Sequence, residues 1–244
     1  MSAAWIDIPG DTASDMLLIA DHASNHVPDG VQLGVPAACM DEHVAIDIGV
    51  APLAYSLCDA LGCAAVLGGV SRLVIDLNRE EDAPCLIPEQ SDGRSISGNA
   101  GLTAAERARR IAHYWHPYHL HIEELISTGK PILLISLHSF TPCLATSDAE
   151  RPWQIGILYN KDNRAARVAL PLLDQAGIVA GDNLPYSGKV LNATMNRHGE
   201  DNGIAYLGIE VRQDLIADAA GVASWCARLA PIIKAVRARV AGHG

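Results

Sequence analysis

Two histidines stand where apolar segments end, and their type and placement suit metal binding. His22 follows the apolar run at residues 16–20, and His138 directly follows the run at residues 132–137. Ligands of open α/β sheets bind outside the carboxyl ends of the parallel strands, so histidines at two such ends are expected to converge. Histidine is the commonest metal ligand in proteins. The alternative is a pair of histidines that only hydrogen-bond to groups at the strand ends.

A third metal ligand is expected, because a catalytic zinc ion usually takes three protein ligands and a water. Asp47 is the first candidate, since it precedes an expected helix that begins near Val50. The other interpretation of Asp47 is a helix N-cap, a position at which aspartate is common. Four further residues compete with it for the metal: Asn25, His26, Glu42 and His43.

Two arginines bracket the apolar segment at residues 73–77, and Asn78 adjoins the second of them. The guanidinium group binds carboxylates through two parallel hydrogen bonds, so Arg72 and Arg79 are candidate receptors for an acidic ligand. The competing interpretation is a surface ion pair between Arg79 and one of the glutamates that follow it.

A glutamate interrupts the last apolar segment. Glu210 lies between Ile209 and Val211, where an uncompensated charge is costly. Two interpretations stay open. Glu210 either pairs with Arg212 or another arginine of the core, or it is a general base beside a metal.

Four more histidines lie close together in the sequence and resemble a metal cluster at first sight. On a helix their spacing scatters them around the axis, and only two of them share a face. We therefore predict that they belong to an amphipathic helix and bind no metal. They are His113, His116, His119 and His121.

The elements that must position these residues follow from the apolar pattern. Six apolar segments have the length of buried strands: 16–20, 64–67, 73–77, 132–137, 154–159 and 205–211. Helical patterns cover residues 50–61, 103–126, 163–175 and 222–240, with a capping box at Thr103 and a kink expected at Pro117.

Strands that alternate with helices predict an α/β fold with a mainly parallel central sheet flanked by helices. We expect one catalytic domain spanning residues 1–244. Two long stretches rich in Gly, Pro, Asn and Asp, at 80–101 and 181–203, are expected to form functional loops at the site end of the sheet.

The amino-acid composition disfavours several classes of binding partner. Lys and Arg number 18 against 28 Asp and Glu, for a formal net charge of −10. This balance disfavours nucleic acid and anionic membranes. Aromatic residues make up only 5%, which disfavours platforms for stacking bases.

The expected location is the cytoplasm. No apolar run reaches the roughly 20 residues that span a bilayer, and the first ten residues show no signal-peptide pattern. The six cysteines form no CxxC pair and have no zinc-finger spacing, so we predict buried thiols in a reducing compartment. The sequence leaves the oligomeric state open.

From about Leu17 to Leu215 the sequence resembles the N-formylglutamate amidohydrolase family. The matching residues occur in order: His22, the stretch at 71–79, His138 with Ser139, and Glu210. The stretch at 71–79 is the most specific part. The family is distantly similar to the zinc carboxypeptidases and to the aspartoacylase and succinylglutamate desuccinylase group. The resemblance implies a zinc-carboxypeptidase-like (phosphorylase/hydrolase-like) fold with a mixed sheet and one catalytic Zn²⁺ per chain.

The same resemblance implies the metal ligands. His22 and His138 match the two zinc histidines. Carboxypeptidase-like enzymes place the acidic ligand three residues after the first histidine, where this sequence has Asn25. The formylglutamate family uses an aspartate at the start of the next helix, which implies Asp47 here.

The resemblance also implies the remaining roles. Glu210 matches the catalytic base, and Arg72 matches the arginine that polarises the acyl oxygen. Asn78 and Arg79 match the motif that binds a substrate carboxylate. Three further residues match the substrate site more loosely: Arg197, His198 and Arg212.

The implied activity is zinc-dependent hydrolysis of a small anionic N-acyl amino acid. N-formyl-L-glutamate is the first choice of substrate, with formate and L-glutamate as products. One alternative is a deacylase or amidase with the same mechanism that acts on another N-acyl amino acid or a peptide-like compound. A second alternative is a non-catalytic relative that binds a ligand or zinc on the same scaffold.

Overall fold

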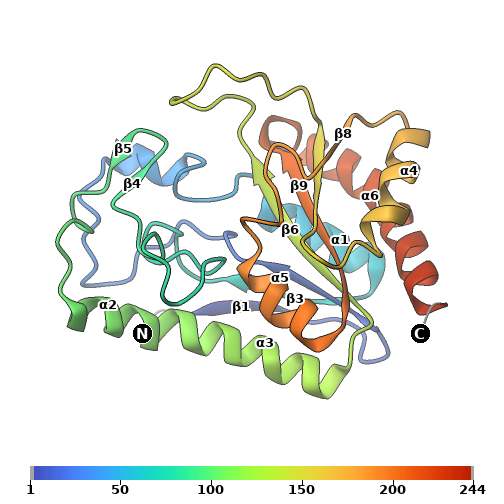
Figure 1. The fold of residues 1–244 in the computed structure, drawn as a ribbon, viewed down its shortest axis with the longest axis horizontal. Coiled ribbons are helices and arrows are strands. Elements are labelled where there is room, and N and C mark those ends of the chain that lie inside the picture. The colour runs from blue at the N-terminus through green and yellow to red at the C-terminus, as the bar shows by residue number, and fades with distance from the viewer. Residues whose placement is uncertain (1–2, 243–244) are drawn as a thin grey trace.

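The structure, a computed structural model, describes residues 3–242 and is built around a seven-stranded mixed sheet (Figure 1). The predicted domain of residues 1–244 extends beyond the described residues at both ends. The strands of this sheet are β1 (Trp5–Ile8), β2 (Met16–Ala20), β3 (Ala64–Gly68), β6 (Leu133–Phe140), β7 (Ile155–Leu158), β8 (Ala180–Asp182) and β9 (Ala205–Arg212).

The strand order across the sheet is β1-β3-β2-β6-β9-β7-β8. The four strands β3, β2, β6 and β9 run parallel to one another. Strand β1 pairs antiparallel with β3, and β7 pairs antiparallel with β9 and parallel with β8. Every residue of β2 and β6 is buried. Helices and loops cover both faces of such strands, which explains their unbroken apolar runs. The α/β fold class predicted from the sequence is therefore confirmed.

Helices pack on both faces of the sheet (Figure 1). They are α1 (Val50–Leu61), α2 (Ala104–Arg110), α3 (His116–Gly129), α4 (Ala166–Gln175), α5 (Ala193–His198) and α6 (Ala219–Ala241). Short 3₁₀ turns lie at Ala37–Asp41, Glu200–Asn202 and Gln213–Leu215. Residues of α1, α4 and α6 form one apolar core with the sheet, and residues of α3 and α5 form a second core on the opposite face.

The alternation along the strands decides which side chains reach each face. Leu137 of β6 and Ile209 of β9 belong to the core shared with α1 and α6. Successive residues of a strand point to opposite faces. His138 and Glu210 therefore point to the other face, on which the loop after β3 lies.

The predicted strand at residues 73–77 is wrong. This stretch forms turns, in which the Ser71 carbonyl accepts hydrogen bonds from the backbone of Val74 and Ile75. Its apolar side chains are buried in the second core. An apolar run that fills a core from a loop has the same sequence pattern as a buried strand. The other predicted strands are confirmed, while the short edge strands β1 and β8 were not predicted.

The long helical segment after Thr103 is confirmed. Thr103 and Glu106 form both hydrogen bonds of a capping box. The chain remains helical through α2, a π-helical segment at Ile111–Trp115, and α3. Pro117 lies in the first turn of α3, directly after that π-helical segment. A π-helical segment, a usual cause of helix kinks, thus directly precedes the proline at which a kink was predicted.

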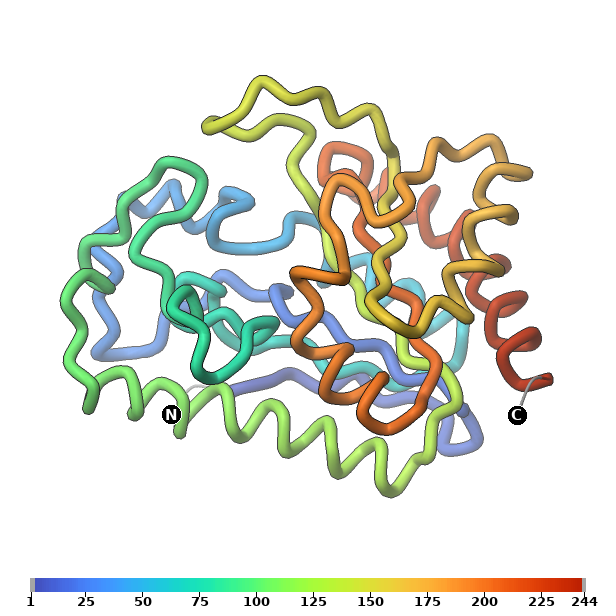
Figure 2. The backbone as a smooth tube through the Cα atoms, viewed as in Figure 1, coloured from blue at the N-terminus to red at the C-terminus, as the bar shows by residue number. Residues whose placement is uncertain are grey.

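Residues from both predicted long loops line the pocket described below, and Figure 2 shows the course of these loops. Residues 80–101 contain a hairpin of β4 (Gln90–Ser91) and β5 (Arg94–Ser95). Residues 181–203 contain α5. Ser91 from the first loop and Tyr186 from the second both line the pocket described below.

One helix of the described residues, α6, is long and apolar enough to cross a membrane by length and composition. A core helix of a soluble protein meets the same criteria, and α6 packs against α1 and α4 with Leu229, Ile233 and Val236 buried. All six cysteines are free thiols. Contrary to the prediction of burial, Cys85 and Cys143 are exposed because both lie in surface loops.

Candidate active site

A pocket of about 330 Å³ opens at the carboxyl ends of the parallel strands. Most of the residues that the sequence singled out for chemistry line it. They are His22, Asp47, Arg72, Asn78, Arg79, His138 and Glu210. The structure therefore brings the predicted strand-end residues together in one pocket.

The sheet itself positions the residues at the base of this pocket. His22 follows β2 after one residue, and His138 lies in the neighbouring strand β6. Glu210 of β9 stands directly beside His138 in the parallel register of β6 and β9. These three side chains are buried.

Asp47 reaches the same point from the segment before α1. Its backbone N–H donates to the His22 carbonyl at 3.0 Å. The N-cap of α1 is Gly49, with a positive φ of 79°. A Cβ atom at Gly49 would stand 2.1 Å from the Ile216 carbonyl oxygen, so a side chain has no room there. Asp47 is therefore not a helix cap, and its carboxylate turns into the pocket.

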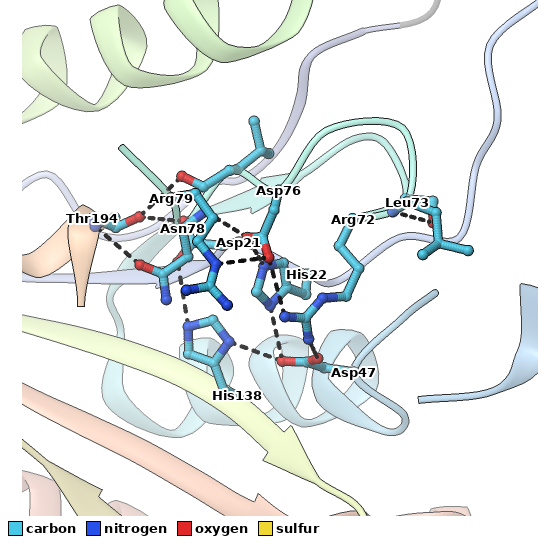
Figure 3. A network of polar contacts seen from close by, with 12 residues as sticks. Asp21, His22, Asp47, Arg72, Leu73, Asp76, Asn78, Arg79, His138 and Thr194 are labelled. Carbon is cyan, nitrogen blue, oxygen red and sulfur yellow. Dashed lines mark hydrogen bonds and ion pairs between the residues drawn. The ribbon is translucent and has the colours of Figure 1, made fainter. Parts of the chain in front are cut away.

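Ligand atoms of His22, Asp47 and His138 all lie within 4.8 Å of one another, and all three residues are buried. The Asp47 Oδ2 atom is 3.4 Å from His22 Nδ1 and 2.8 Å from His138 Nδ1 (Figure 3). Two ligands of one tetrahedral zinc ion stand about 3.4 Å apart, because each lies about 2.1 Å from the metal. This cluster has the size of a metal site.

The residues that competed with Asp47 have other partners. Asn25 donates from its amide to Asp41, and Glu42 pairs with Arg94. His43 binds Asp92 at 3.0 Å. Among residues 3–242 the only group that meets the geometric criteria for a metal site is His22, Asp47 and His138.

A carboxylate lies behind each of the two histidines. His22 Nε2 is 2.6 Å from Asp76 Oδ1, and His138 Nε2 is 3.3 Å from Asp21 Oδ2 (Figure 3). Histidines that bind a metal through one ring nitrogen usually direct the other to a carboxylate or carbonyl, which fixes the ring and its tautomer. Both rings therefore present Nδ1 toward Asp47.

The Asp21 carboxylate is itself held in place. Its Oδ1 atom accepts hydrogen bonds from Tyr118 and Thr194, each at 2.9 Å. Asp21 is fully buried, while its Oδ2 atom has no hydrogen bond of good geometry. The side chain is anchored through one oxygen and turned toward His138 with the other.

The charges in this cluster favour a cation. Burial and nearby Arg72 would lower the pKa of His22, but the carboxylates of Asp76 and Asp47 outweigh them and raise it. Burial would lower the pKa of His138, but Asp21 and Asp47 raise it well above its usual value. Burial would raise the pKa of Asp47, yet both histidines lower it. A divalent metal would replace the protons that these carboxylates hold on the rings.

The residues present fit a metal ion on independent grounds. His22 Nδ1 is buried and has no hydrogen-bond partner. Buried polar atoms are nearly always satisfied, so an unpaired Nδ1 in this position suits a metal ligand. Two imidazoles and one carboxylate form a donor set typical of catalytic zinc.

Arg72 links two of the carboxylates. Its guanidinium donates to Asp47 and to Asp76, each at 3.2 Å. Arg79 lies 3.6 Å from Asp76 and lines the pocket. The ion-pair partner of Arg79 is therefore Asp76 and not one of the glutamates that follow it, which was the competing interpretation.

Glu210 has the environment of a proton-transfer group. Its Oε2 atom is buried with no hydrogen-bond partner, and the residue lines the pocket. Burial raises the pKa of Glu210 to about 7, against the opposing effect of His138. The suggested ion pair with Arg212 is absent, because Arg212 binds Asp214 at 2.8 Å.

Three predicted substrate-site residues lie outside the pocket. Arg197 stacks over the ring of Trp115, 4.7 Å from its centroid. Arg212 follows Glu210 by two residues, but its pairing with Asp214 holds it toward the surface. His198 is fully buried and contacts His119.

Sequence reasoning missed the supporting carboxylates. Asp21 adjoins His22, and Asp76 lies in the arginine-bracketed stretch, so both were visible without an assigned role. Proximity to a strand-end histidine was the available signal. Tyr186 and Asp92, which also line the pocket, carried no signal because they belong to irregular loops.

Comparison with known proteins places the chain among relatives. The family model described as N-formylglutamate amidohydrolase matches residues 14–217. No curated protein sequence matches at a significant level.

Three solved structures are similar to this chain. The gene product Atu2144 from Agrobacterium tumefaciens has a TM-score of 0.90 at 29% identity, over 96% of this chain and 94% of that one. The N-formylglutamate amidohydrolase from Ralstonia eutropha JMP134 has a TM-score of 0.72 at 18% identity, over 98% and 99%. A bacteriophage poly-gamma-glutamate hydrolase has a TM-score of 0.50 at 14% identity, over 100% and 93%. At these identities the last two show a shared fold.

Proposed function

We infer that this chain, which belongs to the N-formylglutamate amidohydrolase family, hydrolyses the amide bond of a small N-acyl amino acid. N-formyl-L-glutamate is the first choice of substrate, and formate and L-glutamate are then the products. The observation that carries this inference is the buried cluster of His22, Asp47 and His138, which lies beside Glu210 in one pocket.

His22, Asp47 and His138 would hold one Zn²⁺ per chain. When bound, zinc activates a water for attack and polarises the acyl oxygen as a Lewis acid. The carboxylates of Asp76 and Asp21 keep the two rings oriented for this role.

Glu210 is the proposed general base. A pKa of about 7 lets one carboxylate both accept and return a proton near neutral pH. Glu210 takes a proton from the attacking water while the new C–O bond forms at the acyl carbon. It then gives that proton to the amine nitrogen as the C–N bond breaks. The products are the free acid and the amino acid, so atoms and protons balance.

Arg72 is proposed to stabilise the oxyanion. It is fixed by two carboxylates and still borders the pocket, so its charge is placed before the reaction begins. A positive group held in position needs no reorganisation when negative charge develops on the acyl oxygen.

Arg79 and Asn78 are proposed to hold the α-carboxylate of the substrate. The Asn78 amide oxygen accepts the backbone N–H of Thr194 at 3.0 Å, so its NH₂ group remains for a ligand. Arg79 has one long contact to Asp76, at 3.6 Å, and its guanidinium fork suits a carboxylate. Holding this group orients the acyl carbon for attack.

The whole chain is proposed to act as one catalytic domain in the cytoplasm. The site draws on β2, β6, β9 and both long loops, so it needs most of the chain. The six free thiols support a reducing compartment.

A panel of N-acyl amino acids, assayed with and without a chelator, tests this function. We expect release of formate from N-formyl-L-glutamate, loss of activity with the chelator, and recovery with added zinc. Faster turnover of another N-acyl amino acid would change the substrate but keep the mechanism. Ligand binding without turnover of any member would identify a non-catalytic relative, and activity unaffected by metal removal would refute the zinc mechanism.

A further inference from the structure

The outer wall of the pocket is assembled around a single carboxylate. Asp92 lies at the turn of the β4–β5 hairpin, with a positive φ of 42°, and its side chain is only 6% exposed. Its neighbour Gly93 also has a positive φ, which is the backbone shape of a tight two-residue hairpin turn. The turn therefore directs Asp92 inward, although a loop tip normally exposes its side chains.

Asp92 joins this hairpin to the loop between β6 and β7. Its carboxylate accepts from the backbone N–H of Ala145 at 2.9 Å and of Thr146 at 3.1 Å, and from the Thr146 hydroxyl at 2.7 Å. Burial would raise the pKa of Asp92, but these hydrogen bonds outweigh it and lower the pKa. Asp92 is thus an ionised acceptor, and Figure 2 shows the loop extending above the sheet beside the hairpin.

The fourth contact of Asp92 is His43. The His43 Nε2 atom is 3.0 Å from Asp92 Oδ2. Because a carboxylate only accepts hydrogen bonds, Nε2 must carry the hydrogen. His43 is half-buried and lines the pocket. Its ring is therefore held from behind by an anion while one side borders the space for a ligand.

The charges that line the pocket indicate what His43 could bind. A substrate such as N-formyl-L-glutamate brings two carboxylates, and each needs a cationic partner inside a pocket that already holds several acidic groups. Arg72 is engaged by Asp47 and Asp76, which leaves Arg79 for one carboxylate. Arg94, on the same hairpin, is paired with Glu42.

We propose that His43, held by Asp92, forms the subsite for the side-chain carboxylate of a dicarboxylic N-acyl amino acid. In the complex, one ring nitrogen of His43 stays on Asp92 and the other faces the ligand carboxylate. The subsite is built by three segments remote in sequence, around His43, Asp92 and Ala145. This assignment rests on the proposed hydrolysis of N-acyl amino acids.

The test compares two substrates that differ only in the charge of the side chain. N-formyl-L-glutamate and N-formyl-L-glutamine are assayed with wild type, His43→Gln and His43→Lys. Wild type is expected to prefer the glutamate compound by about tenfold or more in kcat/KM, as befits a hydrogen bond to a charged group. His43→Gln should lose most of this preference through a higher KM for the glutamate compound, with kcat within about twofold. His43→Lys, which keeps a cation, should retain part of it.

His121→Gln is the matched control. His121 also binds an aspartate, Asp7, at 2.7 Å, but it lies on α3 outside the pocket. This variant should keep the wild-type preference. Equal turnover of both substrates by wild type, or an unchanged preference in His43→Gln, would overturn the subsite while leaving the hydrolase function intact.

A direct binding measurement separates this proposal from the function on which it rests. If no N-acyl amino acid is hydrolysed, the proposed function fails. Calorimetric titration with L-glutamate and L-glutamine then still decides the subsite. We expect tighter binding of L-glutamate to wild type and no such difference in His43→Gln. Equal affinities in wild type would contradict the subsite.

Discussion

The two buried pairs of histidines in this protein differ in the groups that surround them. His22 and His138 lie with ring centroids 5.0 Å apart, and His119 and His198 lie 5.1 Å apart. Every member of both pairs is buried. Distance and burial alone therefore do not distinguish them.

The first pair is enclosed by carboxylates. Asp76 and Asp21 lie behind the rings, and Asp47 lies between them. These negative charges raise the pKa of both histidines despite their burial. A buried site with this much negative charge is stable only with a cation in it, either protons or a metal.

The second pair consists of two histidines that hydrogen-bond to each other. His119 Nε2 donates to the Leu77 carbonyl at 3.1 Å, so its Nδ1 accepts from His198 Nε2 at 2.8 Å. Burial lowers the pKa of His119 to about 4 and the pKa of His198 to about 3. Both rings are neutral at physiological pH and support the packing of α3 against α5. The two pairs differ in their partners: carboxylates contact the rings of the first pair, and a backbone carbonyl contacts the second.

Removal of the metal ligands should give the largest effect. His22→Ala and His138→Ala are each expected to lose bound zinc and with it all catalysis, since three protein ligands are the minimum for this type of site. Zinc content by mass spectrometry and formate release measure this. His198→Gln should keep its zinc, because the second pair lies outside the candidate metal site. Zinc retained at the wild-type level in both alanine variants would remove the site.

Replacement of the proposed base should act on rate alone. Glu210→Gln keeps the shape of the side chain but cannot take a proton, so kcat should fall about 10²–10⁴-fold. Zinc content and the thermal midpoint should match wild type, because Glu210 is not proposed as a ligand. A folded, zinc-loaded and fully active variant would refute the role. Loss of zinc would instead make Glu210 a ligand and weaken the assignment of Asp47.

Asp21→Asn probes the carboxylate behind His138. The amide oxygen of the new side chain must serve Tyr118 and Thr194, so its NH₂ group would face His138 Nε2. Two donors then oppose each other, and zinc affinity should fall about 10–100-fold. Competition with a coloured chelator measures the Kd. Asp7→Asn, at the exposed partner of His121, should leave it unchanged. A lower thermal midpoint with wild-type zinc affinity would show that Asp21 only supports folding.

The sequence predicts the first pair well because strand ends are local features. His22, His138 and Glu210 each adjoin an apolar segment, and the parallel sheet brings such ends together. Asp47 was one of five candidates for the third ligand, and only the resemblance to a known family favoured it over its rivals. The fold class followed from the alternation of strands and helices. The incorrect strand prediction at residues 73–77 did not change this pattern.

The second pair and the pocket wall were beyond sequence reasoning. The sequence predicts His119 as a helical residue, as it is in α3, but its partner lies 79 positions away on α5. The contact depends on how α3 and α5 meet over the sheet, which no local spacing encodes. The same holds for Asp92, whose four hydrogen bonds come from two other segments. Arg197 was misplaced for the same reason, because its contact with Trp115 is tertiary.

The smallest effect expected is a pH dependence of stability that belongs to the second pair. The pKa of both rings is lower in the folded protein than the ordinary value of 6.5. The unfolded chain therefore takes up protons first, and the stability from this pair, full above pH 6.5, is lost as pH falls toward 4. Between pH 7.5 and 5.5 the loss should be about 1 kcal/mol for each histidine. Urea denaturation of metal-free wild type and of a His119→Gln/His198→Gln double variant at both pH values measures it. The double variant should show the smaller decrease, because the first pair, with its raised pKa values, contributes equally to both proteins. An identical pH dependence in the two proteins would show that the His119–His198 pair is not held neutral by burial.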